Sequence, residues 1–215
     1  LPVDKVVHSL MFLSLFIFPF VFRRLLEQFF VPSTATAVLS LCAIILITTL
    51  LPVGKIYDFS ALTLFAAALL LMLTRRWRWF LVVFALAGLN KETSILLTLA
   101  FAKYYYQRLD RPSFTRLMTA QAAIYVVTRL LLLIVFSQNP GGIVEYHLID
   151  HFNAAIEDPF SAATFTISDI ILIGVVAYKW NSKPDFLRDC VLTIVMPQIV
   201  LYFLFGSPYE IRVFY

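Results

Sequence analysis

The chain has 215 residues, of which 61% are hydrophobic and 14% are charged, and its mean hydropathy is +0.87. Soluble domains are about half apolar and a quarter charged, so this composition excludes a soluble globular domain and also excludes intrinsic disorder. Two cysteines are too few for a disulfide-stabilised scaffold. The net charge is +4, and in so apolar a chain the positions of the cations are more informative than their number.

Six apolar stretches match the length of a membrane-spanning helix. A bilayer core about 30 Å thick is crossed by roughly 20 residues of helix, and the alternating pattern of a membrane barrel is absent. The sequence therefore predicts an all-α protein, a polytopic transmembrane helical bundle. The predicted spans are residues 6–22, 35–53, 59–74, 117–136, 161–178 and 190–206.

A seventh apolar stretch, residues 79–106, does not fit a single crossing. Basic residues flank it on both sides, at 75–78 and 103–111, and positive charge in short loops marks the cytoplasmic side of a membrane. Both flanks should therefore be cytoplasmic, so the segment must enter and return. We predict a hairpin of two short helices, with the polar residues 90–93 at its tip and facing the outer side. The alternative is one long helix whose two central charges pair on its face.

The other cations support the same orientation. Twelve of the seventeen Lys and Arg residues lie in loops that one topology places in the cytoplasm. They are Arg23, Arg24, Arg75, Arg76, Arg78, Lys103, Arg108, Arg111, Arg116, Lys179, Lys183 and Arg188. The charge thus predicts a multi-pass protein of the cell inner (plasma) membrane, with the lipid bilayer as its partner and no nucleic acid.

The same pattern predicts one membrane domain over residues 1–215. Segments 54–58, 137–160 and 207–215 are then outside the cell membrane. Because the sequence starts at Leu1 without an initiator Met and stops within an apolar run at Tyr215, we expect the domain to be truncated at both ends.

The tetrad Asn90-Lys91-Glu92-Thr93 is a candidate functional site, because ionisable groups at membrane depth are costly unless they are paired or solvated. Lys91 could bind a phosphate, Glu92 could pair with it or act as a base, and Thr93 could cap the second helix. The first amides of that helix would add a dipole that favours an anion. The structural alternative is a surface turn whose two charges neutralise each other.

Two more ionisable residues lie at or inside predicted spans. Arg129 lies well within residues 117–136, where its side chain cannot easily reach the interface, so we expect a partner inside the protein or an anionic ligand. Asp58 precedes the apolar run 59–74 and is first of all a helix N-cap. A catalytic or metal-binding role is its alternative.

The outer segment 137–160 is rich in acidic residues and histidines, beginning with Glu145. If this part is helical, His147, Asp150 and His151 share a face that could hold a divalent metal, although no metal-binding motif is present. Such residues more commonly belong to an amphipathic helix that lies along the membrane surface.

Glu210 and Arg212 lie at the outer end of the last span. They could line the same outer cavity as the tetrad, or one of them could form a structural salt bridge with a neighbouring helix. The chain has no Walker-type loop, no GxSxG elbow, no zinc cluster and no EF-hand. Neither a nucleotide-driven pump nor a hydrolase of the soluble type is indicated.

Five short motifs extend over much of residues 55–215. They are KIYDFSAL at 55–62, RRWRW at 75–79, AGLNKET at 87–93, VEYHL at 144–148 and YEIRVFY at 209–215. Together they resemble a group of poorly characterised bacterial multi-pass inner-membrane proteins. That group is similar to the membrane glycosyltransferases of the GT-C fold, which take a sugar from a polyprenyl-phosphate carrier and act on the extracytoplasmic side.

This resemblance implies direct displacement at the anomeric carbon of a lipid-linked sugar. A carboxylate deprotonates the acceptor while cations stabilise the departing lipid phosphate. In several GT-C families a Leu-Thr-Lys-Gly-type break between two short helices lies beside the cavity for the lipid-linked donor. Residues 89–92, with the sequence LNKE, are the nearest match here.

The resemblance also implies roles for individual residues. Lys91 and Arg212 would be the phosphate partners, while the carboxylate of the family's first outer loop would precede Leu1 or survive as Asp4. The catalytic candidates in view are Asp58, Glu92 and Glu145. The wider set for lipid phosphate or another anion is Asn90, Lys91, Thr93, Arg129, His147, Glu210 and Arg212. A divalent metal cofactor is compatible with this chemistry, but no spacing indicates one.

Two other classes of function fit the same sequence. The first is a transporter or lipid carrier whose discontinuous helices bind an anion, and the second is a structural membrane subunit. An outer cavity shared by Asp58, Lys91, Glu145 and Glu210 would favour the enzyme. A cavity reached from both sides would favour transport.

Overall fold

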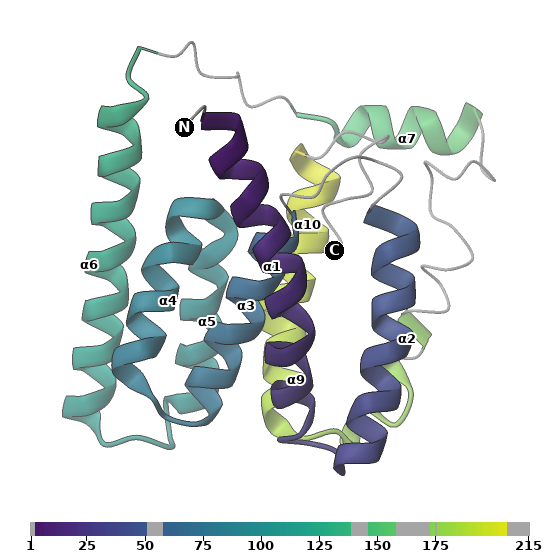
Figure 1. The fold of residues 1–215 in the computed structure, drawn as a ribbon, viewed down its shortest axis with the longest axis vertical. Coiled ribbons are helices and arrows are strands. Elements are labelled where there is room, and N and C mark those ends of the chain that lie inside the picture. Colours follow the sequence, from purple (N-terminus) through teal and green to yellow (C-terminus); the bar gives the residue numbers. More distant parts are fainter. Residues whose placement is uncertain (1–2, 51–57, 139–145, 158–172, 175, 206–215) are drawn as a thin grey trace. The chain divides into compact units, whose positions relative to one another are not determined.

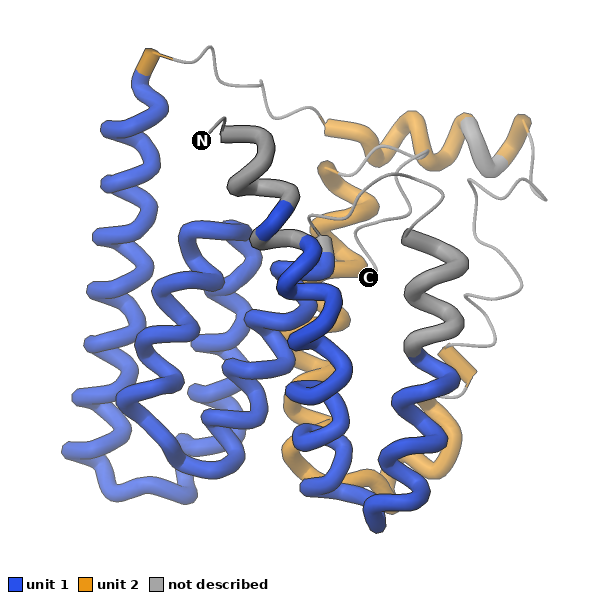
Figure 2. The backbone as a smooth tube through the Cα atoms, in the orientation of Figure 1, with its two compact units in different colours: residues 1–137 blue, residues 138–215 orange. Residues whose placement is uncertain are grey.

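The computed structural model describes residues 3–50, 58–138, 146–157, 173–174 and 176–205 (Figure 1). Regular structure in this part of the chain is helical throughout, so the predicted all-α class is confirmed. The chain divides into two compact units, Leu1–Ser137 and Gln138–Tyr215 (Figure 2), and we treat each unit separately.

Unit 1 contains six α-helices and one short 3-10 turn in its described part. The helices are α1 (Val3–Leu26), α2 (Pro32–Leu50), α3 (Asp58–Leu73), α4 (Trp77–Asn90), α5 (Ile95–Tyr105) and α6 (Arg111–Val135), and the 3-10 turn is η1 (Glu92–Ser94). Helix α1 packs along α3 through Phe18, Leu25 and Ala66, and Thr63 of α3 donates a hydrogen bond to the carbonyl of Ser14, 3.1 Å away. Figure 1 shows α4 and α5 side by side next to α6.

An aromatic cluster holds α4 and α5 together at their shared base. The Trp77 ring, on the first residue of α4, contacts the rings of Phe101 and Tyr105 edge-on, with centroids 5.8 and 5.1 Å apart. Tyr105 is the last residue of α5, and its buried hydroxyl donates to the carbonyl of Met72 at 2.8 Å. Since the start of α4 meets the end of α5, the chain has turned back on itself. The predicted hairpin of short helices within 79–106 is therefore confirmed.

Helix α6 begins at a well-defined cap. The Asp110 carboxylate accepts a hydrogen bond from the amide of Ser113 at 3.0 Å, and Pro112 occupies the first turn, where its missing N–H costs nothing. This amide lowers the pKa of Asp110 below its usual value. The cap fixes the basic end of α6 beside the start of α4.

The described part of unit 2 includes one short and one long helix, besides helical residues at 173–174 and 176–177. The two helices are α7 (Leu148–Glu157) and a continuous helix over Asp185–Phe205, made of α9 (Asp185–Cys190), the π-helical η3 (Val191–Val195) and α10 (Met196–Phe205). A 3-10 turn, η2 (Trp180–Ser182), precedes them. The amide of His147 donates to the carbonyl of Leu204 at 2.9 Å, which ties the start of α7 to the end of α10.

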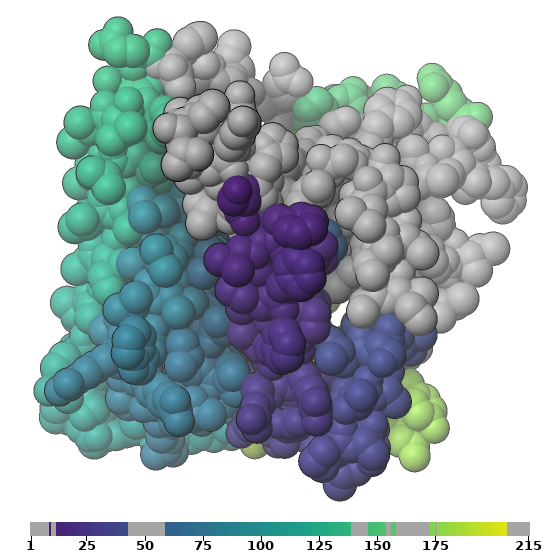
Figure 3. Space-filling view, in the orientation of Figure 1, coloured from purple at the N-terminus to yellow at the C-terminus, as the bar shows by residue number. Residues whose placement is uncertain are grey.

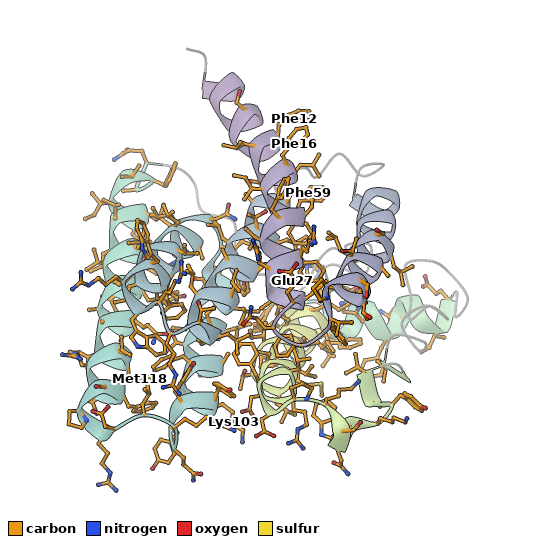
Figure 4. All side chains as sticks on the ribbon, turned by 60° about the horizontal axis from the view of Figure 1, so that its bottom comes forward. Phe12, Phe16, Glu27, Phe59, Lys103 and Met118 are labelled. Carbon is orange, nitrogen blue, oxygen red and sulfur yellow. The ribbon has the colours of Figure 1, made fainter. Side chains whose placement is uncertain are left out.

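Within the described residues, two helices are long and apolar enough to cross a membrane: Arg111–Val135 and Asp185–Phe205. Shorter apolar helices cover Pro32–Cys42, Phe59–Leu73 and Trp77–Asn90. Large apolar side chains remain exposed, including Phe12 and Phe16 of α1, which forms part of the surface in Figure 3 and carries both labelled rings in Figure 4. Five of the six predicted spans overlap helices within the described residues, and the sixth, 161–178, lies mostly outside them.

Candidate functional site

The tip of the hairpin is a sharp break in the helix. Helix α4 ends at Asn90, and Lys91 is extended, with φ −141° and ψ 139°. The 3-10 turn Glu92–Ser94 follows, and α5 begins at Ile95. The alternative of one long helix through this segment is therefore wrong. Lys91 and Glu92 therefore lie between the two α-helices and belong to neither of them.

An ion pair joins this turn to the neighbouring helix α6. Nη2 of Arg129 lies 2.9 Å from Oε2 of Glu92, and the Tyr125 hydroxyl, one turn earlier on α6, donates to the Glu92 carbonyl at 3.2 Å. Arg129 therefore has a partner within the protein, but the expectation that this partner is buried is wrong. The pair is not buried, because the Glu92 side chain is 72% exposed and that of Arg129 is 34% exposed.

A third helix reaches the same turn. The Ser60 hydroxyl of α3 donates to Oδ1 of Asn90 at 3.3 Å, so side chains of α3 and α6 hold the two sides of the break. Asp58 begins α3 two residues before Ser60, but its side chain lies outside the described part. Lys91 lies between Asn90 and Glu92 in the break, and its side chain is partly exposed. We call Ser60, Asn90, Lys91, Glu92, Tyr125 and Arg129 the tip site.

Polar side chains also line the interior below the tip site. Ser94 and Thr98 lie one turn apart at the start of α5, and Gln121 and Thr128 lie two turns apart on α6. All four are buried. Ser94 Oγ, Thr98 Oγ1 and Gln121 Oε1 have no hydrogen-bond partner among the described residues. A buried polar stripe thus descends from the break into unit 1.

Thr93 does not cap the second helix. It is the middle residue of the 3-10 turn, and the start of α5 has no side-chain cap. Backbone carbonyls already accept hydrogen bonds from two amides at this helix start. The amide of Ser94 donates to the Lys91 carbonyl, and that of Ile95 donates to the carbonyls of Glu92 and Thr93. The prediction of a Thr93 cap was therefore wrong, and fewer amides are available to an anion than expected.

The other predicted outer residues are not brought to the tip site by any described contact. Glu145, Glu210 and Arg212 lie outside the described residues, and so does the side chain of Asp58. The proposed shared outer cavity thus stays a prediction. His147 belongs to unit 2, which is described by itself.

The histidines of unit 2 do not converge on a common point. Nδ1 of His147 lies 2.7 Å from Oδ2 of Asp150, whereas the His151 ring packs edge-on against the rings of Tyr202 and Phe203. In the described part of the chain, no three His, Cys, Asp or Glu side chains are grouped so that they could hold a metal ion.

Two residues of the tip site, and one buried residue below it, were not anticipated from the sequence. Ser60, Tyr125 and the buried Ser94 are neutral polar residues within apolar runs. The only available signal was spacing, because Tyr125 precedes Arg129 by one helical turn and therefore shares its face.

Comparison with protein-family models, with curated proteins and with solved structures gives no match. The function of the tip site is therefore argued from its own residues.

Proposed function

We propose that this protein is a membrane-embedded, glycosyltransferase-like enzyme that transfers a sugar from a polyprenyl-phosphate donor on the extracytoplasmic side of the inner membrane. The observation that carries the proposal is the break between α4 and α5, with the cations Lys91 and Arg129 on its two sides. A discontinuous helix is a recurrent way to place charged groups and free backbone at depth in a membrane protein.

The membrane assignment draws support from helix length and surface. Helices α1 and α2 contain 24 and 19 residues, and α6 and the Asp185–Phe205 helix contain 25 and 21. At 1.5 Å per residue each is about 28 to 38 Å long, which matches a bilayer core of roughly 30 Å. Together with α3 and the predicted span 161–178, they make up the six crossings of the proposed topology.

The tip site offers the charges that the reaction needs. A lipid phosphate leaving the anomeric carbon gains negative charge, which Lys91 and Arg129 would stabilise. Glu92 pairs with Arg129 in the absence of donor, and a phosphate bound to Arg129 would release that carboxylate. The acceptor hydroxyl would then give its proton to Glu92 and attack the anomeric carbon, while the bond from that carbon to the phosphate oxygen breaks.

A second candidate function is transport of an anionic lipid or solute through the same break. The observation in its favour is the stripe of Ser94, Thr98 and Gln121, whose buried oxygens lack partners among the described residues. Polar side chains inside a membrane bundle commonly line a path for substrate. In a glycosyltransferase, by contrast, these buried polar residues would have only a packing role.

The test compares two lysines of the hairpin. Lys91→Ala should lower transfer from a polyprenyl-phosphate sugar roughly 100-fold or more, because it removes a cation aimed at the leaving group. Lys103→Ala changes the net charge equally at an exposed position of α5, away from the tip, and should keep wild-type transfer. Both purified variants must give the same elution profile, which shows that they are folded.

Two results would contradict the proposal. Full transfer by Lys91→Ala removes the tetrad from the site. Movement of labelled donor across sealed vesicles, lost in Lys91→Ala and unaccompanied by sugar transfer, would assign the break to transport instead.

A further inference from the structure

A cavity lies at the opposite end of the α4–α5 hairpin from the tip site. It has a volume of about 570 Å³ and lies between the start of α4 and the start of α6. Its walls comprise Trp77, Arg78, Leu81, Leu109, Asp110, Ser113, Arg116, Leu117 and Ala120. Since α4 has 14 residues and therefore spans about 20 Å, this basal cavity is separate from the tip site.

The basal cavity combines two guanidinium groups with apolar walls. Arg78 belongs to α4 and Arg116 to α6, both side chains are exposed, and Arg116 helps the Ser113 amide to lower the pKa of the nearby Asp110 carboxyl. The carboxylate of Asp110 is engaged by the Ser113 amide as the cap of α6. Most of the remaining lining is hydrocarbon. The cavity is therefore amphipathic, with cations above an apolar trough.

The cavity continues onto a surface that faces lipid in the proposed topology. It shares Arg116 and Ala120 with a shallow groove along α6. Beyond that groove, α6 exposes a long apolar surface at Val126, Val127, Leu130, Leu131, Leu133 and Ile134. The basal cavity thus lies at the basic end of a membrane-capable helix, where lipid headgroups would be found.

We propose that the basal cavity binds an anionic phospholipid, with its phosphate at Arg78 and Arg116 and an acyl chain along Leu81, Leu117 and Ala120. Guanidinium groups are the preferred protein partners of phosphate oxygens. The apolar trough favours a lipid over a soluble phosphate, because a free anion would leave the trough unfilled. Basic pockets between membrane helices on the cytoplasmic side are known to take such headgroups.

The charge around the cavity favours the same ligand. Five further cations lie at this end of unit 1, namely Arg75, Arg76, Lys103, Arg108 and Arg111. Basic residues near an anionic membrane surface attract anionic lipid, so such lipid concentrates at this end of unit 1. General attraction of this kind does not require a cavity, and the test must separate the two effects.

The experiment is native mass spectrometry of the purified full chain with added phosphatidylglycerol or phosphatidylcholine. Wild type should retain phosphatidylglycerol preferentially. The double variant Arg78→Gln/Arg116→Gln should retain at least tenfold less. The matched control Arg76→Gln/Lys103→Gln loses the same two charges outside the cavity and should retain as much as wild type; Lys103 is labelled in Figure 4.

A third variant tests the cavity without changing charge. Ala120→Phe fills the trough and keeps both guanidinium groups, so it should also lose phosphatidylglycerol. Equal losses in the matched control would show general surface attraction and overturn the proposal. Displacement of the lipid by an equal concentration of inorganic phosphate or glycerol phosphate would assign the site to a soluble anion and overturn it as well.

Discussion

Gly88 lies where α4 packs tightly against α6. A Cβ at this position would be 3.0 Å from Oγ1 of Thr128 and 3.6 Å from Oγ of Ser94. Thr128 cannot easily move, because it is buried and its hydroxyl donates to the Tyr125 carbonyl at 2.9 Å. The absence of a side chain at Gly88 therefore lets α4 pack close to α6. This close packing brings Glu92 within reach of Arg129.

Gly88→Ala should accordingly destabilise the protein, although alanine is the better helix former. Alanine gains roughly 0.5 to 1 kcal/mol inside a helix, whereas overpacking a tight contact costs about 1 to 3 kcal/mol. We expect a net loss of about 1 kcal/mol, which corresponds to a fall in Tm of roughly 2 to 4 °C for a chain of this size. Thermal unfolding of the protein in detergent measures this fall in Tm.

Two further variants test whether crowding against Thr128 causes this loss of stability. Gly88→Ala combined with Thr128→Ala removes the crowded oxygen and should recover most of the loss. Gly174→Ala is the matched control, because a Cβ there meets nothing within 4 Å. A fall in Tm for Gly174→Ala as large as for Gly88→Ala would show that the contact with Thr128 is not the cause.

Charges at the tip site could be identified from the sequence, but their partners could not. Lys91, Glu92 and Arg129 stand out because they interrupt long apolar runs. The Glu92–Arg129 pair joins residues 37 positions apart, and only the fold determines which acid meets Arg129. Ser60 and Tyr125 carry no charge and could not be distinguished from ordinary polar residues of a helix.

At the scale of elements, the hairpin was predictable because two basic flanks required the chain to return. Its exact break was not. Thr93 is a good capping residue by type, yet the helix restarts two residues later, after the 3-10 turn. The backbone bonds of that turn satisfy the amides that a Thr93 hydroxyl would otherwise have to reach. Capping preference is a local signal, and the turn geometry overrode it.

Helix α7 is the element with the clearest division between apolar and polar faces. Ile149, Phe152 and Ile156 share one face by their helical spacing and are 65%, 64% and 78% exposed. Asp150, Asn153 and Glu157 share another. The Tyr146 and His151 rings contact α10 near its end, so α7 starts at the level where a membrane-capable helix finishes. This arrangement suits an interfacial helix, as the sequence predicted.

Spin labels on neighbouring residues of α7 test that role. In a background without Cys42 and Cys190, nitroxides at Phe152→Cys and Asn153→Cys should report opposite environments in vesicles. The first should be relaxed mainly by oxygen, which concentrates in lipid, and the second by a water-soluble nickel chelate. Since α7 contains no Lys or Arg, the result should not depend on anionic lipid. Equal accessibilities at the two positions would show that α7 does not lie at the interface.

At the scale of the whole molecule, the excess of cations is a signal of orientation. Twelve cations lie in loops or helix ends that the proposed topology places on the cytoplasmic side, and Lys5, Lys55, Lys91, Arg129 and Arg212 do not. Of these five, Lys91 lies in the helix break and Arg129 pairs with Glu92 there, while Arg78 and Arg116 of the twelve line the basal cavity. In the proposed topology, the two ends of unit 1 should therefore face different sides of the membrane.

Labelling of single cysteines from one side of the membrane tests this orientation, each unit by itself. In unit 1, Lys91→Cys should react with an impermeant maleimide added to intact spheroplasts, and Lys103→Cys should react only after lysis, because the hairpin carries them at its tip and near its base. In unit 2, His147→Cys should react from outside.

The rates should also differ between the two outer positions. A hairpin whose first helix is about 21 Å long cannot cross a core of about 30 Å, so position 91 is reached only through an outer opening and should react more slowly than position 147. Reaction of position 91 only after lysis, together with position 103, would place the tip on the cytoplasmic side. Because extracytoplasmic transfer requires the tip outside, that single result would overturn both the topology and the proposed function.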